Sequence, residues 1–146
     1  MKNLLAGLLL SATLILGTSP ARAEGAWLTN YEQALAKAKQ ENKRVLMDFT
    51  GSDWCSWCMK LDKEVFSTSK FTSYAAQKLV LLKVDFPRFK HLTDEQQKAN
   101  EKLAREFGIQ GYPTVIILDA AGKKIGQTGY QPGGPEAFLA TLEAIK

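Results

Sequence analysis

Two cysteines, Cys55 and Cys58, are the only ones in the chain, and two residues separate them. They follow an apolar run at residues 45–49 and turn-forming residues at 51–53, and they precede apolar residues at helical spacing in the segment 59–66. This order predicts a buried strand, a tight turn and a helix that begins at the first cysteine. A disulfide that closes so short a loop removes little entropy from the unfolded chain and so stabilises the fold little. We therefore expect the function of this disulfide to depend on its formation and reduction.

The rest of the chain alternates between helical and strand patterns. The motifs Thr29-x-x-Glu32 and Thr93-x-x-Gln96 predict capping boxes at two helix starts. The expected helices are at residues 29–42, 55–69, 93–107 and 134–145, with a shorter helical segment at 71–77. The expected strands are at residues 45–49, 79–84, 114–118 and 124–130, with a turn at 119–122. This order indicates an α/β fold with a mixed central sheet.

The first residues have the pattern of a secretory signal peptide. Lys2 precedes an apolar segment at residues 4–16, and Ala21-Arg22-Ala23 forms a small-x-small cleavage site. The apolar segment is shorter than the roughly 20 residues that a spanning helix needs, which favours cleavage after Ala23 over an uncleaved anchor. We therefore expect export, to the periplasm if the source is bacterial, and a single mature domain at residues 24–146.

The charge of the mature chain is close to balanced. The full chain has 19 basic and 15 acidic residues, and removal of Lys2 and Arg22 leaves 17 basic against 15 acidic. This balance gives no support to a nucleic-acid or anionic-membrane partner. No segment suggests dimerisation, so we expect a monomer.

Other roles for the cysteine pair are less consistent with its surroundings. A haem-attachment site has His directly after the second cysteine, where this chain has Met59. A structural zinc site has four ligands, and His91 is the only histidine available to help the pair. We therefore expect neither a metal nor another cofactor. A purely structural bridge remains an alternative.

The expected helix start gives the two sulfurs different roles. Unpaired N–H groups and the positive end of the helix dipole stabilise a thiolate at Cys55 and lower its pKa. Cys58 lies one turn later and is expected to face the protein interior. Cys55 is therefore the candidate nucleophile, and Cys58 is the candidate resolving thiol that attacks a mixed disulfide from within.

Residues 44–66 and the segment 108–114, Gly-Ile-Gln-Gly-Tyr-Pro-Thr, resemble the thioredoxin family. The resemblance implies a thioredoxin fold, with a central mixed β-sheet flanked by helices on both faces, and a thiol–disulfide oxidoreductase activity. It also implies a cis peptide bond at Pro113 beside the disulfide, and a substrate strand that pairs with the backbone of Tyr112. An ordinary proline at the entry to a strand is the alternative.

Asp48 is an acid in the middle of the predicted buried strand. Burial there is costly for an ionised carboxylate and raises its pKa. The resemblance implies that Asp48 assists proton transfer to and from the resolving cysteine. This chain has one residue more between Asp48 and Cys55 than most thioredoxins have, so a structural role in capping the turn at 51–53 is the alternative.

Two tryptophans adjoin the cysteines. Trp54 matches the tryptophan that precedes the nucleophile in the family and is expected to flank the substrate cleft, with plain packing as the alternative. Ser56 and Trp57 stand where thioredoxins have Gly-Pro and disulfide isomerases have Gly-His. We expect Trp57 to be exposed, either as a wall that filters partners or as a shield for the disulfide.

These observations favour an exported thiol–disulfide oxidoreductase that reduces or isomerises protein disulfides. Its partners would be protein thiols and disulfides, with a redox partner protein, in solution or bound to the membrane, that restores the working state of the pair. The preference for reductase or isomerase over oxidase rests on analogy. The rival hypothesis is a binding module that has the thioredoxin fold and a resting, non-catalytic disulfide.

Overall fold

The computed structural model describes residues 26–146, and the expected signal peptide at residues 1–23 lies outside them. A mixed four-stranded sheet forms the centre of the molecule, with strand order β2-β1-β3-β4. The strands are β1 (Arg44–Thr50), β2 (Leu79–Asp85), β3 (Thr114–Leu118) and β4 (Lys124–Thr128). The helical elements are α1 (Tyr31–Glu41), α2 (Ser56–Leu61), the π-helical η1 (Asp62–Phe66), α3 (Ser69–Lys78), α4 (Asp94–Glu106) and α5 (Gly134–Ala144).

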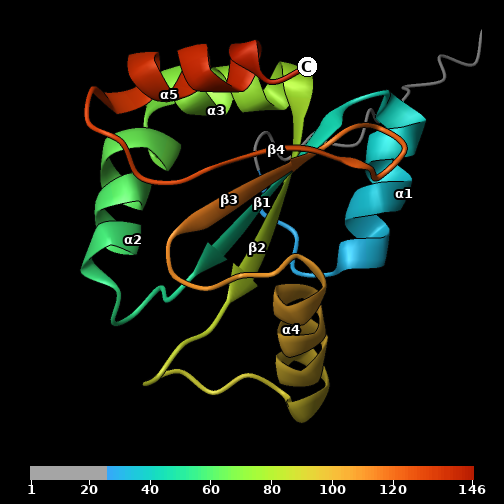
Figure 1. Ribbon diagram of the computed structural model, residues 1–146, viewed down its shortest axis with the longest axis vertical. Helices are drawn as coiled ribbons and strands as arrows, with labels where there is room; N and C mark the ends of the chain where they lie inside the picture. The colour runs from blue at the N-terminus through green and yellow to red at the C-terminus, as the bar shows by residue number, and fades with distance from the viewer. Residues whose placement is uncertain (1–25) are drawn as a thin grey trace, which may run out of the picture.

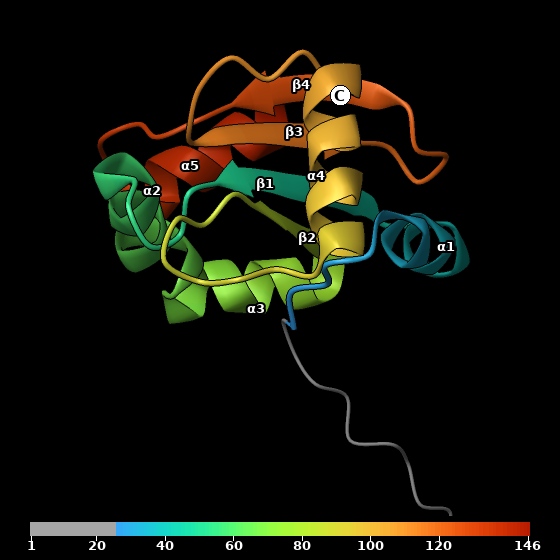
Figure 2. The same cartoon turned by 90° about the horizontal axis from the view of Figure 1, so that it is seen from below.

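Strand β1 is the central element of the sheet. It runs parallel to β2, with Asp48 paired to Lys83, and antiparallel to β3, with Asp48 opposite Val115. Strand β4 pairs antiparallel to β3 and forms one edge. Helices cover both faces of the sheet, as Figures 1 and 2 show, with α3 and α5 on one face and α4 on the other. The expected α/β fold with a mixed sheet and helices on both faces is confirmed.

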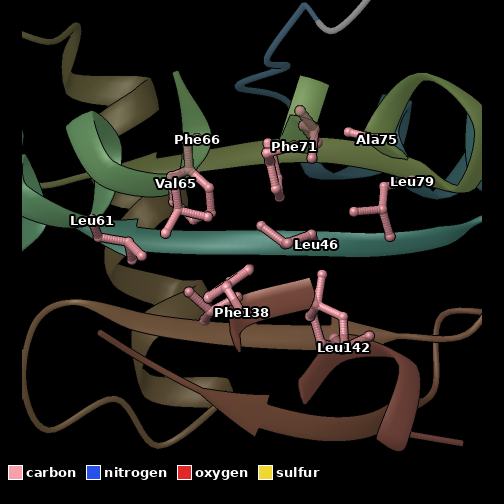
Figure 3. Packing of buried hydrophobic residues seen from close by; sticks show 12 residues of the cluster. Leu46, Leu61, Val65, Phe66, Phe71, Ala75, Leu79, Phe138 and Leu142 are labelled. Atoms are coloured by element: carbon pink, nitrogen blue, oxygen red, sulfur yellow. The ribbon is translucent and has the colours of Figure 1, made fainter. Parts of the chain in front are cut away.

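The two faces of the sheet bury two separate apolar clusters. Side chains alternate along a strand, so Leu46 of β1 points to the face covered by α3 and α5, while Val45 and Met47 point to the other. In Figure 3, Phe66 and Phe71 lie on one side of Leu46, and Phe138 of α5 lies on the other. Because helices cover both faces of the sheet, β1 carries apolar side chains on both of its sides.

Side-chain caps begin several of the helices. The side chain of Thr93 accepts a hydrogen bond from the Gln96 N–H, as the sequence predicts for α4. For α1 the predicted cap is wrong, because Asn30 rather than Thr29 is the capping residue and accepts from the Gln33 N–H. Helix α3 is longer than the segment predicted at 71–77, because the side chain of Thr68 caps its start.

The helix after the cysteines changes its winding part-way. Helix α2 continues into a π-helical turn at η1, closed by the Ser67 N–H that donates to the Asp62 carbonyl at 2.8 Å. Val65 and Phe66 of this turn are both buried. The sequence pattern predicts a regular helix over this stretch, and the structure differs by this one wider turn.

The apolar spacing in residues 93–107 predicts that α4 turns Ala99, Leu103, Ala104 and Phe107 inward, and the structure differs at one of these positions. Ala99 is exposed, whereas the neighbouring Asn100 is 2% exposed. The Asn100 amide donates to the carbonyl of Asp85 at 2.8 Å and accepts from the Gln96 side chain at 2.8 Å. These hydrogen bonds compensate for the burial of a polar group and tie α4 to the end of β2. Among residues 26–146, no helix is both long and apolar enough to cross a membrane.

Phe138 provides a test of this packing. It is fully buried and contacts Phe66 and Phe71 at ring-centroid distances of 5.5 and 6.1 Å. Replacement Phe138→Ala should lower the free energy of unfolding by about 3–5 kcal/mol, because it removes apolar contacts and leaves a cavity. Phe89→Ala is the matched control, since Phe89 is 78% exposed, and it should change stability by less than about 0.5 kcal/mol. Urea unfolding of both variants measures the difference, and equal effects would contradict the assignment of the core.

Candidate active site

Three loops meet at one end of the sheet, where β1 and β2 end and β3 begins (Figure 1). The loop after β1 carries Trp54 and Cys55 and leads into α2. The loop after β2 begins at Phe86, and the loop before β3 contains Tyr112 and Pro113. The parallel pairing of β1 with β2 and the antiparallel pairing with β3 bring these segments together.

The two cysteines form a disulfide at the start of α2. Cys55 is the N-cap residue, and its Sγ accepts a hydrogen bond from the Cys58 N–H at 3.2 Å. Cys55 is 6% exposed and Cys58 is 4% exposed. The predicted helix start at Cys55 is confirmed. A backbone N–H and the end of the helix dipole both favour negative charge on the Cys55 sulfur once the disulfide is reduced.

Asp48 lies on the sheet face that α2 and η1 cover, because it shares that face of β1 with Leu46. Leu61 and Cys58 are buried on the inner side of α2 above this face. Asp48 is only 4% exposed, and its Oδ1 has no hydrogen-bond partner among residues 26–146. The expectation of a buried carboxyl in β1 is confirmed.

The surroundings of Asp48 raise the pKa of its carboxyl to about 7. Desolvation by burial is the main cause; the positive charge of Lys83 opposes the increase, and the negative charges of Asp62 and Asp85 add to it. A group with this pKa gains and loses a proton near neutral pH. The site therefore contains a buried carboxyl with a raised pKa on the face of the sheet beneath the helix that carries Cys58.

Trp54 is held on several sides. Its indole N–H donates to the Phe86 carbonyl at 2.7 Å, and the Arg88 guanidinium lies over its ring at 3.9 Å from the centroid. The ring also lies against Gly51, where a Cβ would collide with the indole. These contacts fix Trp54 beside Cys55. The Arg88 guanidinium covers one face of the Trp54 ring, which the sequence analysis expects to flank the substrate cleft.

Tyr112 lies against Trp54 and is followed by Pro113. The Tyr112–Pro113 peptide bond is cis, as the family resemblance implies. The Tyr112 ring meets the Trp54 ring edge-on at 5.9 Å and packs on Phe86 at 5.3 Å. Thr114, where β3 starts, pairs with Phe49 of β1. The segment that the sequence suggests as a docking edge therefore joins the same cluster as Trp54.

Trp57 is 54% exposed, which agrees with its expected exposure. Its ring packs on Tyr130 at 5.0 Å, and the Lys60 ammonium lies over both rings at 5.2 and 5.1 Å. The Tyr130 hydroxyl donates to the Glu64 carboxylate at 2.9 Å. Trp57, Tyr130 and Lys60 therefore form a cluster of two aromatic rings and one cation on the α2 side of the disulfide.

Three residues of this environment have no assigned role in the sequence-based hypothesis: Asp53, Arg88 and Tyr130. Asp53 was identified only as a turn former, yet its carboxylate accepts the backbone N–H groups of residues 88, 89 and 90, each at 2.9 Å. Desolvation acts in the opposite direction, but these hydrogen bonds lower the pKa of Asp53 overall. No local pattern marks such contacts, because their partners are far away in the sequence.

His91 is exposed in the loop after β2. Within the described part of the chain, no group of three or more His, Cys, Asp or Glu residues could hold a metal ion. The disulfide, the tryptophans and Asp48 are therefore the chemically distinctive features at this end of the sheet.

Comparison with known proteins agrees with this geometry. The family model described as a thioredoxin-like domain matches residues 31–146. The chain belongs to the thioredoxin-like family. The disulfide bond reductase DsbH of Chlamydia pneumoniae is 34% identical over 127 residues, which cover 87% of this chain and 76% of the relative.

Two solved structures support the same assignment. A DsbH oxidoreductase superimposes with a TM-score of 0.78 at 34% identity, over 92% of this chain and 93% of the other. The disulphide isomerase from Xylella fastidiosa Temecula1 superimposes with a TM-score of 0.60 at 26% identity, over 77% and 87% of the two chains. With its Cys55–Cys58 pair, this thioredoxin-like chain is a thiol–disulfide oxidoreductase.

The raised pKa of Asp48 predicts a pH-dependent effect of Asp48→Asn on stability. Below pH 3.8, the carboxyl is protonated in both the folded and the unfolded chain. Between pH 3.8 and about 7, only the unfolded chain loses the proton, so the stability of the native protein falls as the pH rises. Asp48→Asn removes this penalty and should raise the free energy of unfolding by up to about 4 kcal/mol at pH 8.

Urea unfolding of the oxidised protein at pH 4 and pH 8 measures this effect. The gain from Asp48→Asn should shrink towards zero at pH 4. Asp119→Asn is a suitable comparison, since Asp119 lies in the turn after β3 and bonds to the Ala121 and Lys123 N–H groups; it should lower stability at pH 8. A loss of stability in Asp48→Asn at pH 8 would contradict a raised pKa.

Proposed function

We propose that this chain is an exported disulfide reductase that acts on disulfides of proteins outside the cytoplasm. The observation that carries the proposal is the position of Cys55, whose Sγ caps α2 and accepts a hydrogen bond from the Cys58 N–H. Export is supported by the signal-peptide pattern of the first 23 residues. The similarity to a protein named disulfide bond reductase supports the reducing direction.

The first chemical step begins from the reduced pair. The Cys55 thiolate attacks one sulfur of the substrate disulfide, so that a bond from Cys55 Sγ to the substrate forms and the substrate S–S bond breaks. The displaced sulfur leaves as a thiolate and takes a proton from solvent. The helix start favours this step because it stabilises the attacking thiolate of Cys55.

The second step resolves the mixed disulfide. The Cys58 thiol gives its proton to the ionised Asp48 carboxylate and attacks Cys55 Sγ. The Cys55–Cys58 bond forms, the bond to the substrate breaks, and the second substrate sulfur leaves as a thiolate. The substrate gains two electrons and the cysteine pair loses two. Asp48 fits the role of acceptor because its pKa of about 7 allows it to take a proton and to release it again near neutral pH.

The residues around the pair would hold the substrate. The backbone of Tyr112, next to Pro113, would pair with an extended substrate strand, while Trp54 and Trp57 would flank it on opposite sides. The oxidised pair then needs two electrons from a partner dithiol protein, in solution or at the membrane. No diffusible cofactor takes part in this cycle.

Capture of the mixed disulfide tests the order of attack. Purified protein should reduce insulin disulfides with dithiothreitol as electron donor. Cys58→Ala removes the resolving thiol, so the variant should accumulate a mixed disulfide between Cys55 and a substrate cysteine, visible as an adduct on a non-reducing gel and by mass spectrometry. Cys55→Ala is the control and should accumulate far less adduct, because Cys58 lies within α2 and lacks the N-cap position that stabilises a thiolate at Cys55.

Three results would contradict parts of this proposal: the enzymatic activity, the reducing direction, or the roles of the two cysteines. A wild-type protein that neither reduces insulin nor traps a partner after Cys58→Ala would favour a binding module with a resting disulfide. Efficient reshuffling of scrambled ribonuclease, with weak net reduction of insulin, would favour isomerase over reductase. Equal trapping by both single-cysteine variants would contradict the assigned roles of Cys55 and Cys58.

Export predicts a specific mature N-terminus. When the full chain is produced in a bacterium, the protein recovered from the periplasmic fraction should begin at Glu24, because the small-x-small site ends at Ala23. Intact-mass measurement identifies the start. Ala23→Asp should block cleavage and leave the precursor mass, since signal peptidase sites require a small residue there. Recovery of uncleaved wild-type protein in the cytoplasm would contradict export.

A further inference from the structure

The loop that follows β2 reaches back to the active-site turn. We call residues 86–92 the Phe89 loop. The Asp53 carboxylate, two residues before the nucleophile, accepts three consecutive backbone N–H groups from Arg88, Phe89 and Lys90 at 2.9 Å each. Three charge-assisted bonds to one carboxylate fix the backbone of the loop tip relative to Cys55.

Further hydrogen bonds hold the base of the same loop. Ser52 donates its backbone N–H and its hydroxyl to the Asp85 carboxylate at 2.9 and 2.5 Å. The Phe86 N–H donates to the Thr50 carbonyl at 2.8 Å, and the Phe86 carbonyl accepts from the Trp54 indole. The Phe89 loop and the active-site turn are therefore one connected unit.

Phe89 projects from this fixed backbone into solvent. It is 78% exposed, the highest value among the exposed large apolar side chains of the described residues. A single exposed apolar residue is common on flexible surface loops. Here the backbone is fixed by three hydrogen bonds, so the exposed side chain is presented in a defined place. Such a fixed side chain loses little backbone entropy when a partner covers it.

The two neighbours of Phe89 are both basic. Arg88 lies over the Trp54 ring at 3.9 Å, which places its positive charge beside the residue that precedes Cys55. Lys90 interacts electrostatically with Asp53, and neither Arg88 nor Lys90 forms a salt bridge within residues 26–146. Asp85, Asp94 and Glu101 line the same hollow as Arg88 and Lys90, so the loop region as a whole carries both signs of charge. The Asp53 carboxylate is occupied by three backbone N–H groups, and the two residues that directly flank Phe89 are cations. A substrate carboxylate next to Phe89 would therefore meet positive charge.

We propose that Phe89 and Arg88, with Lys90, form a specificity site for the substrate polypeptide, which selects disulfides flanked by a large apolar side chain and a carboxylate. The apolar side chain would cover Phe89, and the carboxylate would approach the Arg88 guanidinium beside Trp54. Asp53 is the positioning residue, because it holds the loop without reaching the substrate. This inference rests on the proposed reductase function and adds to it a class of substrate.

Three cyclic peptides with one internal disulfide test this site. The first has Leu beside one cysteine and two Glu beyond it, the second replaces both Glu by Lys, and the third replaces Leu by Ser. At low ionic strength the reduced wild-type protein should reduce the first peptide about tenfold faster in kcat/KM than either of the others. The preference for Glu over Lys should decrease in 0.5 M salt, because screening weakens exposed charges.

The variants separate the two contacts. Phe89→Ser should remove the preference for Leu over Ser and keep that for Glu over Lys. The double variant Arg88→Gln/Lys90→Gln should remove the preference for Glu over Lys and keep that for Leu over Ser. Lys124→Gln, which removes an exposed cation from β4, is the matched control and should keep both preferences. Phe89 is exposed, so Phe89→Ser should have the wild-type melting temperature, which confirms that the variant is folded.

Asp53→Asn tests the positioning role. It keeps the shape of the side chain but weakens its three backbone hydrogen bonds, so both preferences should fall together, and hydrogen exchange at the amides of residues 88–90 should become faster. Faster exchange without a change in preference would overturn the positioning role.

The possible failures point to different conclusions. If the wild-type protein reduces neither insulin nor any of the peptides, the proposed reductase function fails. If it reduces insulin but none of the peptides, the specificity site is wrong and the reductase function stands. If it reduces all three at similar rates, or if its preferences persist in both the Phe89 and the Arg88/Lys90 variants, the specificity site is wrong and the reductase function stands.

Discussion

The alternation of side chains along β1 is the constraint on which the rest of the structure depends. Strands pair with β1 on both sides, and helices cover both faces, so every residue from Val45 to Thr50 is buried. Leu46 and Asp48 point to the face beneath α2 and η1, whereas Val45 and Met47 point to the opposite cluster. A shift of one residue would exchange the two faces and place Asp48 among the side chains of the other cluster. Core packing therefore positions the acid.

The same strand also determines where the loops meet. Because β1 is parallel to β2 and antiparallel to β3, the ends of two strands and the start of a third lie together. Hydrogen bonds between side chains and backbone then hold the active-site turn to the loop after β2. The Asp85 carboxylate accepts from the Ser52 N–H, the Asp53 carboxylate accepts from the N–H groups of residues 88–90, and the Trp54 indole donates to the Phe86 carbonyl. Fixed surroundings of this kind allow a thiol and a substrate disulfide to meet in a defined geometry.

The features that local patterns encode were predictable from the sequence. The first three strands, the start of α4 at Thr93 and the helix start at Cys55 follow from hydrophobic spacing and capping residues. The burial of Asp48 follows from an acid within an apolar run. The π-helical turn, the exchange of Ala99 for Asn100 in the α4 interface and the role of Asp53 could not be predicted. The π-helical turn departs from regular winding at a place that no hydrophobic spacing marks. Asn100 and Asp53 depend on partners that the fold brings close, such as residues 88–90, 35 or more positions after Asp53.

Chemistry and recognition are separated in this site by depth. Cys58 and Asp48 are almost fully buried and share the α2 face of the sheet, where desolvation raises the pKa of the carboxyl to about 7. Trp57 packs on Tyr130 on the α2 side of Cys55, and Trp54 packs under Arg88 on the side of the loop that carries Phe89. The raised pKa of Asp48 depends on its burial, so proton transfer to this carboxyl requires a site beneath the surface. Selection of a substrate depends on contact with its side chains, so the residues that select it must be exposed. Under the proposed mechanism, substitutions on either side of Cys55 would change the substrate preference without altering Cys58 and Asp48, which resolve the mixed disulfide and take up the proton.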